Sequence, residues 1–176
     1  IKKNMKYLSI DIETTGLDPE KCDILEIACI IEDTEKKKSI NATPVMLLYI
    51  DKDYYNFEPE AFEMNFKTMK SIRDEKDQRN DSVCKIEEID YRISNFLHKH
   101  KIDSITLAGA NLEGFDMKFL SKHLSKETLS KFNRRVIEPA HFFVDWEKDE
   151  KLPTLKECKK RAGIEGDVAH NALDDD

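Results

Sequence analysis

The sequence predicts an α/β fold in which helices cover a mixed β-sheet. The first observation is the order of patterns: three strand-like segments come first, and helical and strand-like segments then alternate. The second is composition, because 39% hydrophobic and 37% charged residues suit a soluble globular protein with a heavily charged surface. The third is the length of 176 residues, which is enough for one core. We therefore expect a single domain over residues 1–176.

The expected strands are apolar segments rich in Ile, Val and Leu, separated by polar stretches. In chain order they cover residues 6–12, 24–31, 45–50 and 104–108. The polar residues between the second and third strands predict a hairpin connection or a surface loop. A further strand or extended segment is expected within residues 136–144.

The clearest expected helix covers residues 83–100, where apolar residues recur on one helix face. Pro59 can open a short helix before it. Residues 71–82 are almost entirely polar and predict an exposed connection. Shorter helices are expected at 115–124 and 128–132.

The helix expected at 154–162 has readable ends. Thr154 and Glu157 form a capping-box pattern at its start, and Gly163 can stop it. A last helix is expected to start near Val168. Because the chain then ends on three aspartates, we expect this helix to be truncated.

Composition also limits the function and location. No apolar run approaches the roughly 20 residues needed to span a bilayer, and the N-terminus has no signal-peptide pattern. The four cysteines form no C-x-x-C pair, which favours a reduced intracellular compartment, cytoplasmic or nuclear. A net charge of −7 argues against a simple basic nucleic-acid binder. That objection weakens if bound cations supply the positive charge locally.

The first acidic cluster ends the first expected strand, in the run D-I-E-T-T-G-L at 11–17. Because side chains alternate along a strand, Asp11 and Glu13 lie on one face. Two such carboxylates repel unless a proton or cation lies between them, and their oxygens suit Mg²⁺ or Mn²⁺. Gly16 permits a tight turn that leaves Leu17 exposed. A bare Asp-x-Glu is more often a strand end with solvated acids, so the pair alone does not identify a site.

Two further clusters contain Asp or His. Asp116 lies where a strand gives way to a helix, preceded by Asn111; alone, the aspartate fits a helix-dipole role and the asparagine a turn. His170 lies near the terminal acids, and its near-neutral titration suits a general base. Alone, His170 fits a functional and an incidental role equally well.

Taken together, the three clusters resemble the exonuclease motifs of the DEDDh family, which include D-I-E-T-T-G-L, N-L-E-G-F-D and H-N-A-L-D-D in this order. The resemblance spans residues 11–175. Residues 59–65 and 152–157 are similar to the family too. The resemblance implies a ribonuclease-H-like fold with a five-stranded mixed sheet flanked by helices. It also implies a 3′→5′ exonuclease that releases nucleoside 5′-monophosphates from single-stranded DNA or RNA.

The resemblance assigns roles residue by residue. It implies two Mg²⁺ or Mn²⁺ ions held by carboxylates, with a general base beside them; the four metal ligands are Asp11, Glu13, Asp116 and Asp175, and the base is His170. The family spacing of five residues after the histidine selects Asp175 over its neighbours Asp174 and Asp176.

Substrate contacts follow from the same resemblance. The backbone N–H near Thr14 would hold the terminal 3′-hydroxyl, Leu17 would wedge against the last base, and Asn111 would contact the substrate. Ala110 stands where many members carry His or an aromatic residue, which puts one substrate contact in doubt. Phe115 fits base stacking, although its helical partners favour the core.

Basic residues of the 154–162 helix fit a guide for the nucleic-acid backbone and a solvated helix face equally well; they are Lys156, Lys159, Lys160 and Arg161. A polymerase or another replication protein is an expected partner, and no membrane association is expected. Alternatives are a catalytically weak nucleic-acid-binding or polymerase-associated module of this fold, a ribonuclease-H-like endonuclease, and a structural domain with acidic surface clusters. The first would lack a motif residue, the second would lack the His-x4-Asp element, and the third leaves the ordered spacing unexplained.

Overall fold

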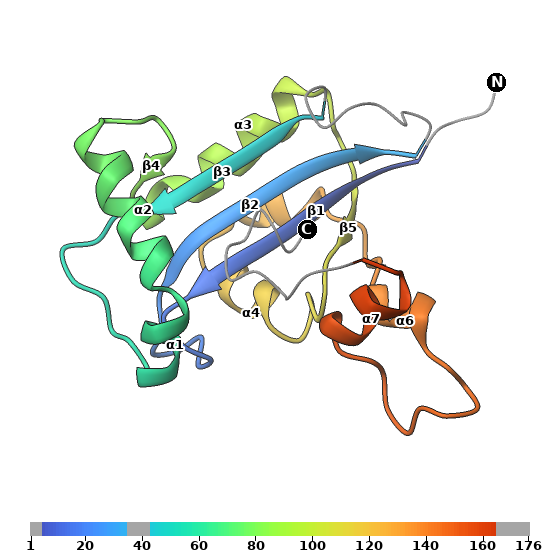
Figure 1. Ribbon diagram of the computed structural model, residues 1–176. Helices are drawn as coiled ribbons and strands as arrows, with labels where there is room; N and C mark the ends of the chain where they lie inside the picture. The colour runs from blue at the N-terminus through green and yellow to red at the C-terminus, as the bar shows by residue number, and fades with distance from the viewer. Residues whose placement is uncertain (1–4, 35–42, 165–176) are drawn as a thin grey trace.

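The structure is a computed structural model that describes residues 5–34 and 43–164. Its five strands are β1 (Lys6–Thr14), β2 (Ile24–Asp33), β3 (Val45–Ile50), β4 (Val83–Cys84) and β5 (Thr106–Ala108). They form one mixed sheet in the order β4-β3-β2-β1-β5, which confirms the predicted α/β sheet (Figure 1). β1 is antiparallel to β2 and parallel to β5, while β3 is antiparallel to β2 and parallel to β4.

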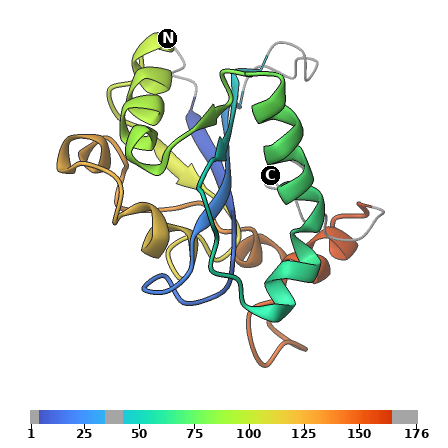
Figure 2. The same cartoon turned by 90° about the vertical axis from the view of Figure 1, so that its left-hand side faces the viewer.

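Helices cover both faces of this sheet. In chain order they are α1 (Pro59–Met64), α2 (Phe66–Asp77), the 3-10 helix η2 (Ile86–Glu88), α3 (Ile89–Lys99), α4 (Asp116–Leu120), α5 (Lys126–Ser130), α6 (Pro139–Phe143) and α7 (Leu155–Arg161). Figure 2 shows the sheet nearly edge-on, with α3 on one side and α2 on the other. None of the helices in the described ranges is both long and apolar enough to cross a membrane.

The main core lies between one face of the sheet and the helices α3 and α4. In β1 the buried residues alternate, so Leu8, Ile10 and Ile12 face this core. Ile93 of α3 and Phe119 of α4 belong to the same cluster. The alternation leaves the polar residues of β1 on the opposite face. The hydrophobic pattern of the strand therefore determines which way its acids point.

The expected strands are confirmed with small shifts at their ends, and so are the ends of α7. The Glu157 N–H donates to Thr154 Oγ1 at 3.3 Å, and the Thr154 N–H donates to the Glu157 carboxylate at 2.6 Å. Gly163 follows with a φ of +72°, a left-handed conformation that glycine adopts without strain. The helix expected from Val168 lies outside the described residues.

The prediction of a connection at residues 71–82 is wrong, because α2 extends through Asp77. Its sequence is polar, but Thr68 and Ile72 are buried against the sheet. The Lys76 ammonium donates to the Asp51 carboxylate at 2.8 Å, which ties the helix end to the end of β3. Tertiary contacts therefore stabilise a helix that has a weak hydrophobic pattern.

The single helix expected at 83–100 is divided into β4, η2 and α3. The Tyr49 N–H of β3 donates to the Ser82 carbonyl at 2.9 Å, so the segment starts as a strand. The Lys85 N–H then donates to the Glu88 carboxylate at 2.7 Å, at the start of η2. Pairing with a strand more than 30 residues away determines this boundary, and helical periodicity does not reveal it.

Two further boundaries differ from the prediction. A strand or extended segment was expected within residues 136–144, and strand pairing there is limited to Ile137, whose carbonyl accepts from the Gly109 N–H at 3.1 Å. Pro139 then starts α6, where its missing N–H has no cost. The helix expected at 115–124 is shorter, because α4 ends at Leu120. The helix expected at 128–132 starts earlier, as α5.

Candidate active site

Asp11 and Glu13 lie on the face of β1 that points away from the main core, as predicted. In the register with β2, Asp11 is opposite Ala28 and Glu13 is opposite Glu26. Glu26 is a third acid on this face, and it is only 2% exposed.

Asp116 reaches this site from the start of α4, 104 residues further along the chain. Its Oδ1 accepts a hydrogen bond from the Ile12 N–H at 3.1 Å. The pairing of β5 with β1 ends at Ser9. The Asp116 carboxylate therefore bonds to the edge of β1 just beyond the point where β5 ends. The Asp116 side chain also makes a hydrogen bond with that of Asp11. Two of the three described acids predicted as metal ligands are therefore in contact.

Burial dominates the electrostatics of Asp116, which is 3% exposed. The pKa of Asp116 is raised to about 7, mainly by burial and to a smaller extent by the negative charge of Glu138. The hydrogen bonds from backbone N–H groups and from Asp11 act in the opposite direction. A carboxylate in this position gains from a nearby cation, because a cation favours the ionised form.

The donor chemistry fits a hard divalent ion, since Asp11, Glu13 and Asp116 offer oxygen atoms alone. Within residues 5–34 and 43–164, however, no three His, Cys, Asp or Glu side chains already form a group that could hold a metal. The other expected residues, His170 and Asp175, lie outside the described residues. The described part of the chain therefore brings together Asp11 and Asp116, two of the residues predicted as metal ligands.

The turn after β1 is held by a residue that the sequence analysis did not assign. The Leu17 N–H donates to Glu58 Oε2 at 3.0 Å, and the Glu58 N–H donates to the Thr15 carbonyl at 2.8 Å. A Cβ on Gly16 would lie 2.5 Å from the Glu58 side chain and 2.6 Å from Cys22 Sγ. Space therefore explains the glycine at this position. Backbone conformation does not, because among the described glycines a positive φ occurs at Gly163 and not at Gly16.

This turn borders a cavity of about 400 Å³ beside the acids, lined by Glu13, Thr14, Leu17, Asn65 and Phe115 among others. Leu17 is 76% exposed, as predicted. Asn65 is buried; its amide donates to the Thr14 carbonyl at 3.1 Å, and its Oδ1 has no hydrogen-bond partner among the residues that the structure describes. Phe115 lies 5.2 Å from Phe119, between ring centroids. It therefore both packs against the core and lines the cavity.

Asn111 shapes the loop that leads to Asp116. It has a φ of +54°, and its N–H donates to the Glu138 carboxylate at 2.6 Å. Its side chain lies over Gly114, where an added Cβ would be 2.2 Å from Asn111 Oδ1. Ala110, Asn111 and Glu138 line a second cavity of about 390 Å³ that continues toward α6 and α7. Asn111 thus has a structural role in addition to any contact with substrate.

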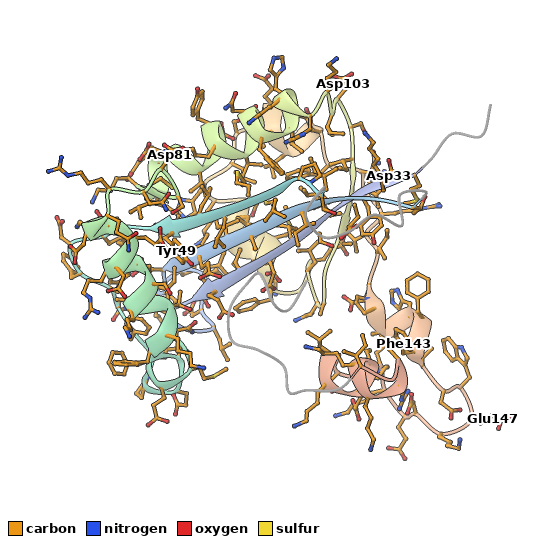
Figure 3. The ribbon with its side chains drawn as sticks, turned by 45° about the horizontal axis from the view of Figure 1, so that its top comes forward. Asp33, Tyr49, Asp81, Asp103, Phe143 and Glu147 are labelled. Carbon is orange, nitrogen blue, oxygen red and sulfur yellow. The ribbon has the colours of Figure 1, made fainter. Side chains whose placement is uncertain are left out.

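The basic residues of α7 belong to a unit at one side of the molecule, where Figure 3 labels Phe143 and Glu147. Arg161 Nη2 donates to Asp149 Oδ1 at 2.7 Å, and Arg161 Nη1 donates to the Phe143 carbonyl at 2.6 Å. Arg161 therefore anchors the loop before α7. This function differs from the phosphate guide considered from the sequence.

Four residues at or beside the candidate site were not predicted from the sequence; they are Glu26, Glu58, Asn65 and Glu138. Glu58 immediately precedes the 59–65 stretch that is similar to the DEDDh family, and Asn65 is its last residue, so part of the signal was present. Glu26 lies within β2, in an ordinary apolar strand pattern, and nothing in the sequence alone marks it as buried. Glu138 accepts a hydrogen bond from the N–H of Asn111, 27 residues earlier in the chain, and the spacing of motifs does not predict such a contact.

Comparison with known proteins agrees with this geometry. The exonuclease model of the RNase_T family matches residues 8–175. No curated protein matches the chain. Among solved structures, Escherichia coli exonuclease I in its zinc-bound complex with single-stranded DNA is 20% identical, with a TM-score of 0.64 over 98% of this chain. Its complex with a dT13 oligonucleotide is 18% identical, with a TM-score of 0.62 over 97%.

The moderately thermophilic exonuclease I of Methylocaldum szegediense is also 18% identical, with a TM-score of 0.62 over 97% of this chain. At these identities the likeness shows a shared fold. The chain spans 38% of the length of the protein in each of these three structures. The family match extends beyond the described residues of the candidate site, because it covers both the first motif, at residues 11–17, and the last motif, at residues 170–175. The chain therefore belongs to the RNase_T exonuclease family.

Proposed function

We propose that this chain is a metal-dependent 3′→5′ exonuclease that releases nucleoside 5′-monophosphates from single-stranded DNA or RNA. The observation that carries the proposal is the contact between Asp11 and Asp116, two acids from distant motifs, of which the second is buried with a pKa raised to about 7. The family match and the single-stranded oligonucleotides in the exonuclease I complexes support it. We take residues 1–176 as one exonuclease domain, in line with a family match over nearly that whole range.

Each acid has a proposed place in the reaction. Asp11, Glu13 and Asp116 would hold two Mg²⁺ or Mn²⁺ ions, with Asp175 as the fourth ligand by its motif. Such ions, when bound, supply the positive charge that activates water and stabilises the leaving 3′-oxygen. The bond from the Ile12 N–H fixes the direction of the Asp116 carboxylate. His170 would accept the proton of the attacking water, since its pKa range suits a base at neutral pH.

The cavity beside Glu13 would hold the terminal nucleotide. Leu17 projects at its rim and would pack against the last base, while the turn at Thr14 would contact the terminal sugar. Asn65 fixes the end of β1 through the Thr14 carbonyl. Contacts to sugar and phosphate carry no sequence information, so digestion is expected to tolerate any base.

The test uses 5′-labelled linear single strands of DNA and RNA, incubated with Mg²⁺ or Mn²⁺. We expect a ladder that shortens by one nucleotide at a time from the 3′ end and that disappears with chelator or in Asp11→Ala. A circular single strand should remain intact because it has no end. Cleavage of the circle, or a ladder from the opposite end, would refute the proposed polarity.

A further inference from the structure

Within residues 5–34 and 43–164, half of the outer edge of β3 has no strand beside it. β4 pairs with β3 only at Tyr49 and Ile50. The N–H groups of Tyr49 and Asp51 point outward, to the Ser82 and Cys84 carbonyls, at 2.9 Å each. Backbone groups alternate along a strand, so Val45 and Leu47 point their N–H and C=O groups the same way.

In the described part of the chain, nothing pairs with these groups of Val45 and Leu47 on that side. About four residues of edge, or roughly 13 Å at 3.3 Å per residue, are therefore open to strand pairing. The open stretch is long enough for a short extended peptide.

A groove follows this open edge. It has a volume of about 560 Å³ and lies between residues 44–48 of the β3 edge and the helix α3. Figure 3 shows α3 running alongside β3, from the end near Asp81 toward the end near Asp103. Arg92, Phe96 and Lys99 form the helical wall. A strand next to a helix is a geometry in which an extended peptide can add to a sheet.

The open edge lacks the usual protection of edge strands. Natural sheets guard an exposed edge with charged residues, proline within the strand or a covering element. The open stretch reads Val45-Met46-Leu47-Leu48, with no charge, and Pro44 precedes it. Val45 is exposed, whereas Leu48 is buried in the core. An apolar, unguarded edge of this kind favours pairing with another strand.

Charge identifies the occupant that fits best. Arg92, Lys99 and His100 line the groove, which has Asp81 as its one acidic residue. Arg92 is paired with Asp81 at 2.9 Å, and burial and the nearby Lys99 lower the pKa of His100, which favours its neutral form. Lys99 forms no ion pair with any residue that the structure describes, so it is the positive charge that the groove offers to a ligand. It attracts carboxylates and repels basic segments.

We propose that the β3–α3 groove, meaning the β3 edge at residues 44–48 with the facing wall of α3, binds an acidic extended peptide of a partner protein as an added strand. The peptide's backbone would pair with Val45 and Leu47, and an Asp or Glu side chain would lie against Lys99. The groove lies at the opposite edge of the sheet from β5. A bound peptide therefore leaves the site around Asp116 accessible.

The experiment selects random octapeptides displayed on phage against the whole chain and measures the strongest binder by fluorescence anisotropy. We expect selected peptides rich in Asp, Glu and β-branched residues. Leu47→Pro removes an outward N–H without touching the pairing with β2, and it should weaken binding by about tenfold or more. Leu47→Val keeps the N–H and should bind within about threefold of wild type. Lys99→Glu should weaken binding and leave nuclease activity unchanged.

N-methylation of the peptide tests strand pairing even if the proline variant does not fold. Methyl groups on one alternating set of backbone nitrogens should abolish binding, and on the other set they should be tolerated. Equal binding of both methylated sets, selection of basic peptides or failure to select any peptide would overturn the proposal. Dimers of the chain that disappear in Val45→Pro would assign the edge to a second copy and overturn it as well.

Discussion

Asp116 is the residue whose environment is most at odds with a simple structural role. It is buried, lies against another acid and has a pKa raised to about 7. An acid that only stabilises the N-terminus of a helix would be expected to be exposed, and ionised at neutral pH. Its bond to the Ile12 N–H shows instead that the carboxylate is positioned as part of the β1 edge. Such an arrangement is stabilised when a cation binds nearby.

This raised pKa predicts how stability depends on pH without metal. Between pH 3.8, the ordinary pKa of an aspartate, and about pH 7, the folded state keeps a proton that the unfolded state has released. The contribution of Asp116 to stability is therefore complete at low pH and falls as the pH rises through this window. In chelator, the free energy of unfolding of wild type relative to Asp116→Asn should fall by on the order of 2–4 kcal/mol between pH 4 and 8. Urea denaturation at several pH values measures it.

The same variant separates stability from activity. Asp116→Asn cannot ionise, so it should be at least as stable as wild type at pH 8 in chelator, yet lose roughly a thousandfold or more in nuclease rate. A flat stability difference across pH would contradict the buried-acid interpretation. A variant with near wild-type activity would remove Asp116 from the proposed site.

Prediction from sequence was strongest for residues that carry a motif. The alternation of side chains along β1 correctly predicted that Asp11 and Glu13 lie on one face. Asp116 was selected from the order of the three motifs along the chain. Glu58 and Glu138 were not found, because each accepts a hydrogen bond from a backbone N–H that is 41 or 27 residues away. The local pattern of the sequence contains no information about contacts between residues so far apart in the chain.

Among the elements, the turn between β1 and β2 should control substrate binding. Glu58→Ala removes the acceptor of the Leu17 N–H, so the exposed leucine should lose its fixed position at the cavity rim. We expect KM for a single strand to rise by roughly tenfold with kcat changed less than about threefold, because the carboxylates are untouched. Glu58→Gln keeps an amide oxygen as acceptor and should remain close to wild type. Equal effects of both variants would argue against this role.

The loop before α4 gives a second prediction for an element. Gly114→Ala places a methyl group within 2.2 Å of Asn111 Oδ1, so the Asn111 side chain that packs over the loop before Asp116 must move. We expect a decrease in kcat of roughly tenfold, together with a lower melting temperature. The double variant Gly114→Ala/Asn111→Gly removes the clash and tolerates the positive φ, so it should recover much of both. Steady-state kinetics and thermal melting measure the effect; no recovery would contradict it.

Elements with strong periodicity or readable caps were predicted well, as β3 and α7 show. Elements created by distant pairing were not. β4 exists because it pairs with β3, and α2 is a polar helix held by two buried residues and a salt bridge at Asp51. Their sequences alone favour other structures, so tertiary contacts determine the outcome.

For the whole molecule, a net charge of −7 has to be reconciled with binding a polyanion. Acids gathered at one site offer a solution, since bound divalent ions reverse the local charge where the phosphate would lie. The opposite edge of the sheet carries the basic β3–α3 groove, so the two proposed surfaces differ in charge and in position. An intracellular location and a polymerase or replication partner remain predictions from the sequence.

A titration of Mn²⁺ into chelated protein, followed by both melting temperature and mononucleotide release, decides whether the carboxylates form a metal-dependent nuclease site. We expect no release without metal, and a rise in both signals over the same range of metal concentration. Both responses should be absent in Asp11→Ala, although that variant remains folded. Mononucleotide release in chelator, or an unchanged metal response in the variant, would contradict the proposed site.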